Sequence, residues 1–580
     1  MTLQRIRQID ETLCSVIMSA RRDFAKFAKT EFDVAVIGGG MIGTGVARDA
    51  AMRGLKTVLF EKEDFCYGTS GRSSRMIHGG LRYLANYDLG LVREGLRERE
   101  ILLRLAPHLV HPLKFLIPIY GGFLHKMKLK IGMILYDLLS YDKSLPSHKS
   151  LSRAQVLEAE PALAENGLRG AYVYYDSQIA LTERLCMENV VSARSHGALL
   201  LNHAKAVGLL KESDVVSGVK VVDVLSDKTA QFRSRLVVNV GGPWLDEVVH
   251  GVRKAEQPLA RTTKGIHLVT PKVTKDAVAL FAADGRAYFV MPWLDFELIG
   301  TTDTDYEKDM DAVKAEVEDV KYLQTEVQKA FPKTRFDRIF YTIAGVRSLL
   351  RVEGVKESSV TRRHIIYDHE KKEGLRGLVS VIGGKLTAYR GIAEDITDVI
   401  CRKLGSSAEC ATAKEKLPGA EPTELGKIQA KRDSLAKEQG ISVETLDRLV
   451  SLYGSRYTEV LDYLKKDRRL RERICKTQPD IMAEVVHAIE KESALTLTDF
   501  MIRRSLIAFR ECEGLDCCTK VAKKMGAILR WSSREVASQV NAYKKEIAMR
   551  HAYEKKEQPK PAPKRSRRPR RARRSRRRRA

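Results

Sequence analysis

Residues 33–61 read DVAVIGGGMIGTGVARDAAMRGLKTVLFE, and this stretch predicts a complete strand–helix–strand unit. An apolar, β-branched run (34–37) predicts a buried strand, and the helical spacing that follows ends at Gly54 before a second apolar run (57–60). Gly38, Gly40 and Gly43 have the spacing that tightens a turn, lets a pyrophosphate approach the backbone, and packs helix against strand. Glu61 follows the second strand, where an acid accepts hydrogen bonds from ribose hydroxyls. The unit therefore predicts a dinucleotide site at the start of its helix.

The composition is that of a globular protein with a basic end. The chain has 580 residues, enough for about two to four domains, and 101 Lys and Arg against 74 Asp and Glu give a net charge of +27. Residues 555–580 are rich in Arg, Pro and Ser, so we predict a disordered tail. Such a tail can attract nucleic acid or anionic lipid, but no base-reading fold is recognisable in the body. Sequence-specific nucleic-acid binding is therefore not expected.

The cysteines indicate reduced thiols. Nine of them are scattered along the chain without a regular framework, as in an intracellular or organellar protein. Cys512, Cys517 and Cys518 lie close together in sequence, but no neighbouring His or Cys completes a metal-ligand spacing. We therefore predict helix thiols there and no metal site.

Residues 1–31 leave two interpretations open. Basic residues alternate with apolar ones, as in an organelle transit segment, whereas Asp10, Glu11 and Asp23 favour an ordinary N-terminal helix. No uncharged apolar run reaches the length of about 18 residues that would predict a membrane-spanning helix.

Residues 123–139 predict an amphipathic helix with lysines beside its apolar positions. The apolar positions are Leu124, Met127, Ile131, Ile134, Leu135 and Leu138, and the lysines are Lys126, Lys128 and Lys130. Two interpretations remain: a helix whose apolar face packs on the core, or one that lies in an anionic membrane interface.

Further motifs extend the pattern. Strand patterns lead into the glycines of residues 241–242 and 383–384, and the second pair precedes another helix. Residues 259–304 alternate with Gly and Pro punctuation, which predicts an antiparallel sheet. Residues 424–550 have helical periodicity throughout.

The loop after Glu61 carries a family resemblance. It contains GTSGRSSRMIHGGLRYL (68–84), and later motifs are NVGGPW (239–244), KGIHLVTP (264–271), MPW (291–293), IGTTDTDY (299–306), GVRSLL (345–350), VTRRH (360–364) and GGKLTAYR (383–390). With these motifs, residues 32–550 resemble the FAD-dependent glycerol-3-phosphate dehydrogenases, within the D-amino-acid-oxidase-like flavoproteins.

The fold that the resemblance implies agrees with the patterns. It combines an α/β, Rossmann-like FAD-binding domain, an α+β substrate domain with an antiparallel sheet, and a C-terminal all-α domain. We expect an oxidoreductase region over 32–418, with FAD-binding parts near 32–110, 171–257 and 345–400 and substrate parts near 111–170 and 258–344. The helical domain covers 424–550.

The resemblance also implies the cofactor and its contacts. FAD is expected rather than NAD, because the match continues into the Ser/Gly loop and GGKLT. The expected FAD contacts are Gly38, Gly40, Gly43, Glu61, Thr69, Ser70, Ser74, His78, Gly79, Gly241, Gly384, Leu386 and Thr387.

The implied reaction oxidises sn-glycerol 3-phosphate to dihydroxyacetone phosphate. Paired guanidiniums suit a phosphate, and Arg347 and Arg362 match the family's phosphate-binding arginines, with Arg363 as the alternative to Arg362. Around the substrate the resemblance adds Arg82, Tyr83 and Arg286. His267 is the expected general base, since the ordinary histidine pKa lies near neutrality. Lys385 is expected to stabilise reduced flavin and a developing alkoxide.

Electrons are expected to reach ubiquinone or another membrane quinone. The resemblance implies a peripheral membrane enzyme attached through residues 123–139, at the mitochondrial inner membrane, and leaves a homodimer open. The alternative locations are the cytoplasmic face of a bacterial-type membrane and a peroxisome-like organelle. The alternative activity is that of an oxidase, which uses oxygen and releases hydrogen peroxide. A binding protein acting through its tail is a weaker alternative. Ser348 and Ala388 depart from the family's usual Pro and Thr but remove no charge or glycine.

Overall fold

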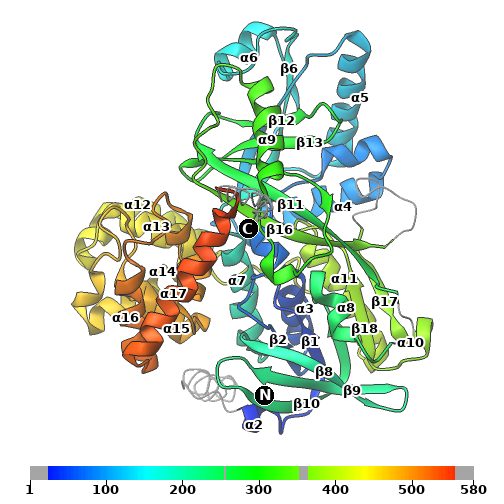
Figure 1. Ribbon diagram of the computed structural model, residues 1–580, viewed down its shortest axis with the longest axis vertical. Helices are drawn as coiled ribbons and strands as arrows, with labels where there is room; N and C mark the ends of the chain where they lie inside the picture. The colour runs from blue at the N-terminus through cyan, green and yellow to red at the C-terminus, as the bar shows by residue number, and fades with distance from the viewer. Residues whose placement is uncertain (1–23, 254–256, 352–362, 555–580) are drawn as a thin grey trace, which may run out of the picture.

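A parallel sheet near the N-terminus forms the base of the molecule. The computed structural model describes residues 24–253, 257–351 and 363–554 (Figure 1). The first sheet contains β1 (Phe32–Ile37), β2 (Thr57–Phe60), β7 (Leu199–Leu201), β8 (Ala204–Glu212), β9 (Val215–Asp223), β10 (Lys228–Asn239), β17 (Ile365–Asp368) and β18 (Leu378–Ile382). Its centre, in the order β18-β10-β1-β2-β7, is parallel, and β8, β9 and β17 pair antiparallel. The predicted Rossmann-like arrangement is confirmed.

The predicted strand–helix–strand unit is β1, α3 (Met41–Met52) and β2. Val34 and Val36 pack toward α3, α7 (Thr182–Ser195) and α11 (Tyr389–Leu404), and the alternate positions of β1 pack toward β8, β9 and β10. The run at 34–37 is continuously apolar because β1 is buried on both faces.

The end of the predicted leader belongs to this core. Residues 24–27 form the short helix α2 (Phe24–Phe27), and the Phe24 ring lies 5.9 Å from that of Phe232. Residues 1–23 lie outside the described residues, so the transit-segment interpretation stays a prediction.

A second, mostly antiparallel sheet stands above the first (Figure 1). Its strands are β3 (Met76–Ile77), β4 (Val110–Pro118), β5 (Lys149–Leu151), β6 (Ala171–Ile179), β11 (Ala260–Pro271), β12 (Ala277–Phe281), β13 (Ala287–Trp293), β14 (Phe296–Gly300), β15 (Thr304–Asp305) and β16 (Tyr341–Leu350). The long pair β11–β16 sets Thr263 opposite Arg347. The connecting helices are α4 (Leu89–Leu105), α5 (Phe123–Leu139), α6 (Arg153–Ala159), α8 (Leu245–Val249), α9 (Val317–Ala330) and α10 (His369–Glu373). The predicted antiparallel substrate sheet is confirmed.

The C-terminal part is the helical lobe at the left of Figure 1. Its helices are α12 (Pro422–Gln439), α13 (Val443–Tyr453), α14 (Tyr457–Lys466), α15 (Met482–Glu492), α16 (Cys518–Leu529) and α17 (Ser533–Arg550). One expected α-helix differs: residues 499–504 form a π-helical turn and residues 507–509 a 3₁₀ turn. Here Arg503 and Arg504 both direct their guanidiniums to Asp64, at 2.7 and 2.8 Å.

These contacts belong to a buried ionic junction between the lobe and the first sheet. Asp64, Arg504, Arg184 and Glu492 are all fully enclosed. The Arg184 guanidinium donates to Glu492 at 2.7 and 2.9 Å. Each buried charge therefore has a partner, as burial requires.

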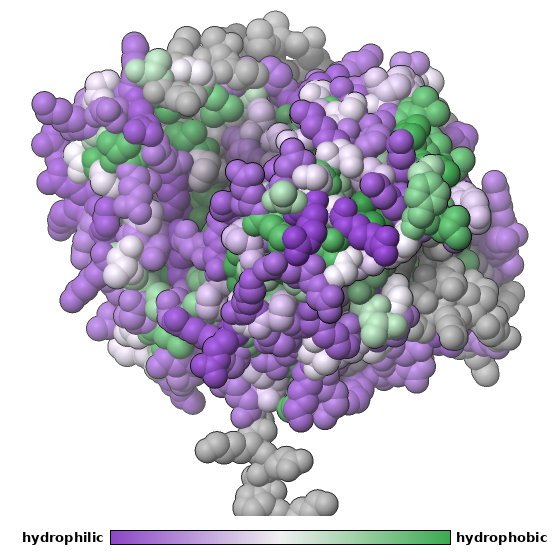
Figure 2. Space-filling view, turned by 90° about the horizontal axis from the view of Figure 1, so that it is seen from above, coloured by the Kyte–Doolittle hydropathy of each residue, from purple (hydrophilic) through white to green (hydrophobic). Residues whose placement is uncertain are grey.

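Helix α5 presents apolar side chains to solvent. Met133 and Tyr136 are its buried positions, whereas Leu124, Ile131 and Leu138 are 61–77% exposed. Figure 2 shows hydrophobic residues gathered at the right of the face seen from above, where α5 lies in Figure 1. The core-facing interpretation of the predicted stripe is therefore wrong, because a different set of side chains contacts the core. Among the described helices, none has the length and apolarity to span a bilayer.

Candidate active site

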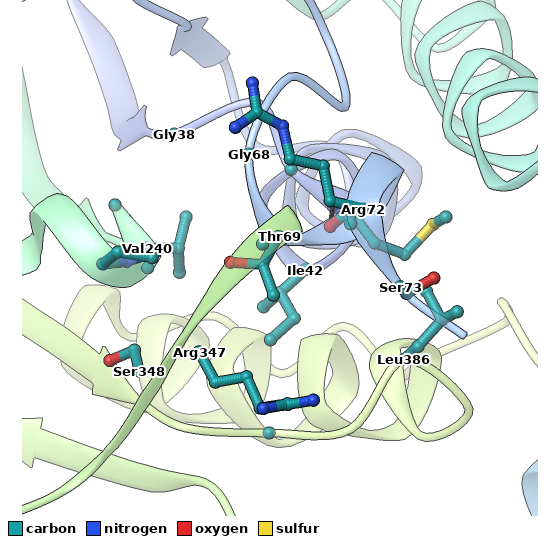
Figure 3. A pocket seen from close by; sticks show the side chains of 18 of the residues that line it. Gly38, Ile42, Gly68, Thr69, Arg72, Ser73, Val240, Arg347, Ser348 and Leu386 are labelled. Atoms are coloured by element: carbon teal, nitrogen blue, oxygen red, sulfur yellow. Dashed lines mark hydrogen bonds between the residues drawn. The ribbon is translucent and has the colours of Figure 1, made fainter. Parts of the chain in front are cut away.

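A cavity of about 630 Å³ separates the two sheets and gathers most of the predicted residues. Figure 3 shows Gly38, Thr69 and Leu386 around the same space as Arg347. The predicted residues that line the cavity are Gly38, Gly40, Gly43, Glu61, Thr69, Ser70, Ser74, His78, Arg82, Tyr83, Gly241, His267, Arg347, Gly384, Lys385, Leu386 and Thr387. Gly79 and Arg286 do not line it, and Arg362 lies outside the described residues.

The glycine turn at one end has no room for side chains. Gly38 has a φ of +112°, and a Cβ there would stand 2.6 Å from the Val240 carbonyl oxygen. A Cβ on Gly43 would stand 1.9 Å from the Gly38 oxygen. Helix α3 starts after Gly40, and residues 40–43 line the cavity, so the helix N-terminus faces it. This geometry matches the backbone cradle that a pyrophosphate requires.

Glu61 stabilises the same turn through its carboxyl group. Its carboxyl accepts hydrogen bonds from the Gly39 amide at 2.7 Å and the Glu63 amide at 2.9 Å. Burial raises the pKa of this carboxyl. Trp244, a cavity residue that sequence reasoning did not select, has a buried Nε1 with no hydrogen-bond partner among the described residues. An unsatisfied donor at the wall of a cavity is a feature of a ligand site.

The Ser/Gly loop joins the two sheets. The Thr69 hydroxyl donates to the carbonyl of Val346 in β16, and the His78 amide donates to the Thr387 hydroxyl at 3.0 Å. The Met41 amide, at the start of α3, donates to Ser70 Oγ at 3.0 Å. The loop thus contacts the glycine turn, the second sheet and the GGKLT segment.

His267 lies on β11 in the cavity wall and is buried. Its Nε2 shares a hydrogen bond of 2.8 Å with Ser74 Oγ. Burial first, and then the charges of Arg347 and Arg75, lower its pKa to about 3. The pKa of His267 is therefore far below the ordinary histidine value that the sequence led us to expect. The imidazole is neutral at physiological pH, which is the state that accepts a proton.

Arg347 lies across the backbone of β11. Its guanidinium pairs with Asp303 at 3.1 Å and donates to Thr301 Oγ1 at 2.9 Å. A Cβ on Gly265 would stand 2.1 Å from Nη2, so the guanidinium occupies the space that this glycine leaves. The motifs quoted above contain Asp303, Thr301 and Gly265, but residue type alone did not identify these three as site residues.

Lys385 follows the double glycine after β18. Its ammonium donates to the Gly79 carbonyl at 3.1 Å and lies 4.7 Å from the centre of the Tyr83 ring. Burial lowers its pKa. Gly79 therefore contributes from behind the cavity wall, by holding Lys385. The Arg82 guanidinium donates a hydrogen bond of 3.2 Å to the Tyr83 hydroxyl.

Two predicted substrate arginines differ in placement. Arg286 lies outside the cavity wall, with Nε 2.8 Å from Asp284 and Nη1 3.2 Å from the Asp303 carbonyl. The alternative Arg363 is exposed and pairs with Asp88 at 2.7 Å. Neither lines the cavity, whose described Lys and Arg residues are Lys62, Arg72, Arg75, Arg82, Lys205, Arg347 and Lys385.

Comparison with known proteins agrees with this geometry. Residues 33–390 match the family model of the FAD-dependent oxidoreductases, and residues 410–536 match the C-terminal domain of alpha-glycerophosphate oxidase. The chain is 40% identical over 541 residues to a glycerol-3-phosphate dehydrogenase of Synechocystis sp., covering 90% of this chain and 97% of that one. It is 36% identical to glycerol-3-phosphate dehydrogenase 2 of Mycobacterium tuberculosis, covering 88% and 87%.

A solved structure extends the likeness to three dimensions. The X-ray structure of a glycerol-3-phosphate dehydrogenase from Bacillus halodurans, complexed with FAD, matches with a TM-score of 0.77 and 28% identity, covering 92% of this chain and 98% of that one. The glycine cradle and the unsatisfied Trp244 donor fit such a dinucleotide. With its FAD-binding fold, its helical lobe and its cation-lined cavity, the chain belongs to the family of FAD-dependent glycerol-3-phosphate dehydrogenases.

Proposed function

We propose that the protein oxidises sn-glycerol 3-phosphate to dihydroxyacetone phosphate. The observation that carries the proposal is that Arg347, Lys385 and the neutral His267 line the same cavity as the glycine turn. The names of the relatives support the substrate.

Each side chain has a role that its environment supports. Arg347 binds the phosphate, for which a guanidinium fork is suited. His267, oriented by Ser74, accepts the hydroxyl proton. Lys385, held by the Gly79 carbonyl, stabilises negative charge that develops on the substrate oxygen. Bound FAD supplies the hydride acceptor of the reaction.

An anaerobic flavin titration tests the proposal. Purified protein should be yellow, and sn-glycerol 3-phosphate should bleach its flavin absorbance, whereas glycerol without the phosphate should not at the same concentration. Arg347→Ala should raise KM for glycerol 3-phosphate strongly while FAD stays bound. An unchanged KM in this variant would contradict the phosphate assignment, and a colourless preparation that takes up no FAD would contradict the whole proposal.

We propose that a membrane quinone, such as ubiquinone, accepts the electrons. The exposed apolar side chains of α5 support this acceptor, because they bring the enzyme to the bilayer where quinone dissolves. The alternative is an oxidase that reduces oxygen. Turnover with a soluble quinone and without hydrogen peroxide supports the first acceptor, and stoichiometric peroxide without quinone turnover supports the second.

The occupant proposed for the exposed face of α5 is an anionic lipid surface. Lys126, Lys128 and Lys130 are exposed beside the apolar side chains, which gives the helix charge complementary to such lipids. Changing all three lysines to Glu should release protein from anionic vesicles in a sedimentation assay. The control variant changes Lys465 and Lys466 on α14 to Glu and should leave vesicle binding unaltered. Equal sedimentation of both variants would contradict the proposal.

Location, assembly and the tail are proposed on sequence grounds. We propose association with the mitochondrial inner membrane, and a homodimer is the assembly to test by light scattering. Import of a fusion of residues 1–31 to a reporter would test the location. Deletion of residues 555–580 should leave FAD and activity intact, whereas loss of the main function would favour a binding protein that acts through its tail.

A further inference from the structure

The helical lobe gathers cysteines that are far apart in sequence. Cys475, Cys517 and Asp516 place one ligand atom each within 4.8 Å of one another. Cys475 Sγ lies 3.3 Å from Asp516 Oδ2. Both cysteines are buried, at 2% and 4% exposure, and neither forms a disulfide. The half-buried Cys512 precedes Asp516 by four residues and does not belong to this group of three.

The fold holds the two contributing segments together. Cys475 lies in a loop that is closed by the bridge between Arg473 and Ile481. Cys517 immediately precedes α16, and Lys520, in the first turn of that helix, donates to the Arg473 carbonyl at 2.6 Å. The cluster is therefore held by contacts that do not involve its own side chains.

We propose that Cys475, Cys517 and Asp516 bind a Zn²⁺ ion, with water in the fourth position. Thiolates and carboxylates are both ligands that zinc accepts, and two thiolates with one carboxylate leave one position of the tetrahedron for water. Each ligating thiol gives its proton to water as its Zn–S bond forms, so the step requires no oxidant.

The other candidate cluster shows why this one is chosen. Asp64, His203 and Asp499 also lie close enough to share an ion. However, Arg503 and Arg504 already neutralise these carboxylates, at 2.7 to 3.1 Å. A divalent cation would have to displace two buried guanidiniums there. At the cysteine cluster, no guanidinium of the described residues binds Asp516.

The ion would tie together a segment that reaches the active-site sheet. Phe509, close before Cys512, accepts a hydrogen bond from Tyr341 of β16 at 3.0 Å and packs its ring 5.4 Å from that of Trp293. Zinc would thus fix the lobe's contact with the second sheet. This role is structural and independent of the proposed substrate.

Metal analysis of the full-length, FAD-loaded enzyme tests the inference. Protein purified under reducing conditions, incubated with Zn²⁺ and then washed with EDTA should retain about one zinc per chain by mass spectrometry. Cys475→Ser and Cys517→Ser should each lower the retained zinc by at least about tenfold. Cys410→Ser removes a half-buried thiol outside the cluster and should leave zinc and FAD content unchanged.

Cobalt provides a readout that does not depend on the variants folding. Co²⁺ bound to the unmodified enzyme should give the ligand-field absorption of a tetrahedral thiolate site, at longer wavelengths than the flavin bands. Asp516→Asn, at an exposed position, should alter this spectrum without loss of FAD. Zinc that EDTA removes completely, a spectrum of octahedral cobalt, or a Cys475–Cys517 disulfide in the reduced preparation would each overturn the inference.

Discussion

Replacing Gly265 by Ala tests the phosphate clamp without removing a charge. A Cβ at this position would meet Arg347 Nη2 at 2.1 Å, Nη1 at 2.5 Å and Cζ at 2.6 Å, and no other group is as close. The guanidinium must retreat by about 1 Å to restore van der Waals contact. A displacement of that size, with the loss of a charge-assisted hydrogen bond, should lower kcat/KM for glycerol 3-phosphate by about 10- to 100-fold.

The assay is steady-state kinetics with flavin content measured in parallel. Gly265→Ala should keep its FAD, and the change should appear mainly in KM. In the Arg347→Ala background the same substitution should have little further effect, because it acts through the guanidinium. Gly426→Ala, where an added Cβ meets nothing within 4 Å, is the matched control. Equal losses of kcat/KM with and without Arg347 would refute the reasoning.

Three further outcomes are expected. Gly43→Ala sets a Cβ 1.9 Å from the Gly38 oxygen, so FAD affinity should fall by at least about tenfold in a flavin-binding titration; unchanged affinity would contradict the cradle. Because the pKa of His267 is lowered to about 3, its ring is neutral above roughly pH 5, and His267→Asn should lower kcat without moving the acid limb of the kcat/KM profile. An acid limb near 6.5 that disappears in the variant would contradict this. Lys385→Met should lower the flavin midpoint potential, because the variant lacks the ammonium that stabilises reduced flavin. A midpoint potential equal to that of the unmodified enzyme would contradict this role.

The fold was largely predictable because its signals are local. The run at 34–37, the three glycines and the helix that follows lie within one stretch, and each element satisfies its own periodicity. The same holds for the alternation in β11 to β14. By contrast, the direction in which α5 turns its apolar side chains depends on its partners: Met133 and Tyr136 contact the core, and periodicity alone did not distinguish them from Ile131 and Ile134.

The candidate site was predictable in its residue types but not in its environment. Motif spacing could identify His267, yet its lowered pKa arises from burial on β11 and from the charge of Arg347. The contact with Ser74 joins β11 to a loop that lies 193 residues earlier in the chain, and it has no counterpart in sequence spacing. Likewise Cys475 approaches Cys517 only through the packing of the helical lobe, which is why the sequence indicated no metal ligands.

The buried ionic junction at Asp64 has a consequence for how the chain can be divided. Removing the helical lobe would strip Asp64 of both its arginine partners and Arg184 of Glu492, leaving uncompensated charges inside the remainder. Breaking such a pair from one side costs about 3–5 kcal/mol. The nucleotide-binding half is therefore not an independently folding domain. A protein that ends before α12 should be insoluble or expanded, even though the removed helices contribute none of the glycine cradle.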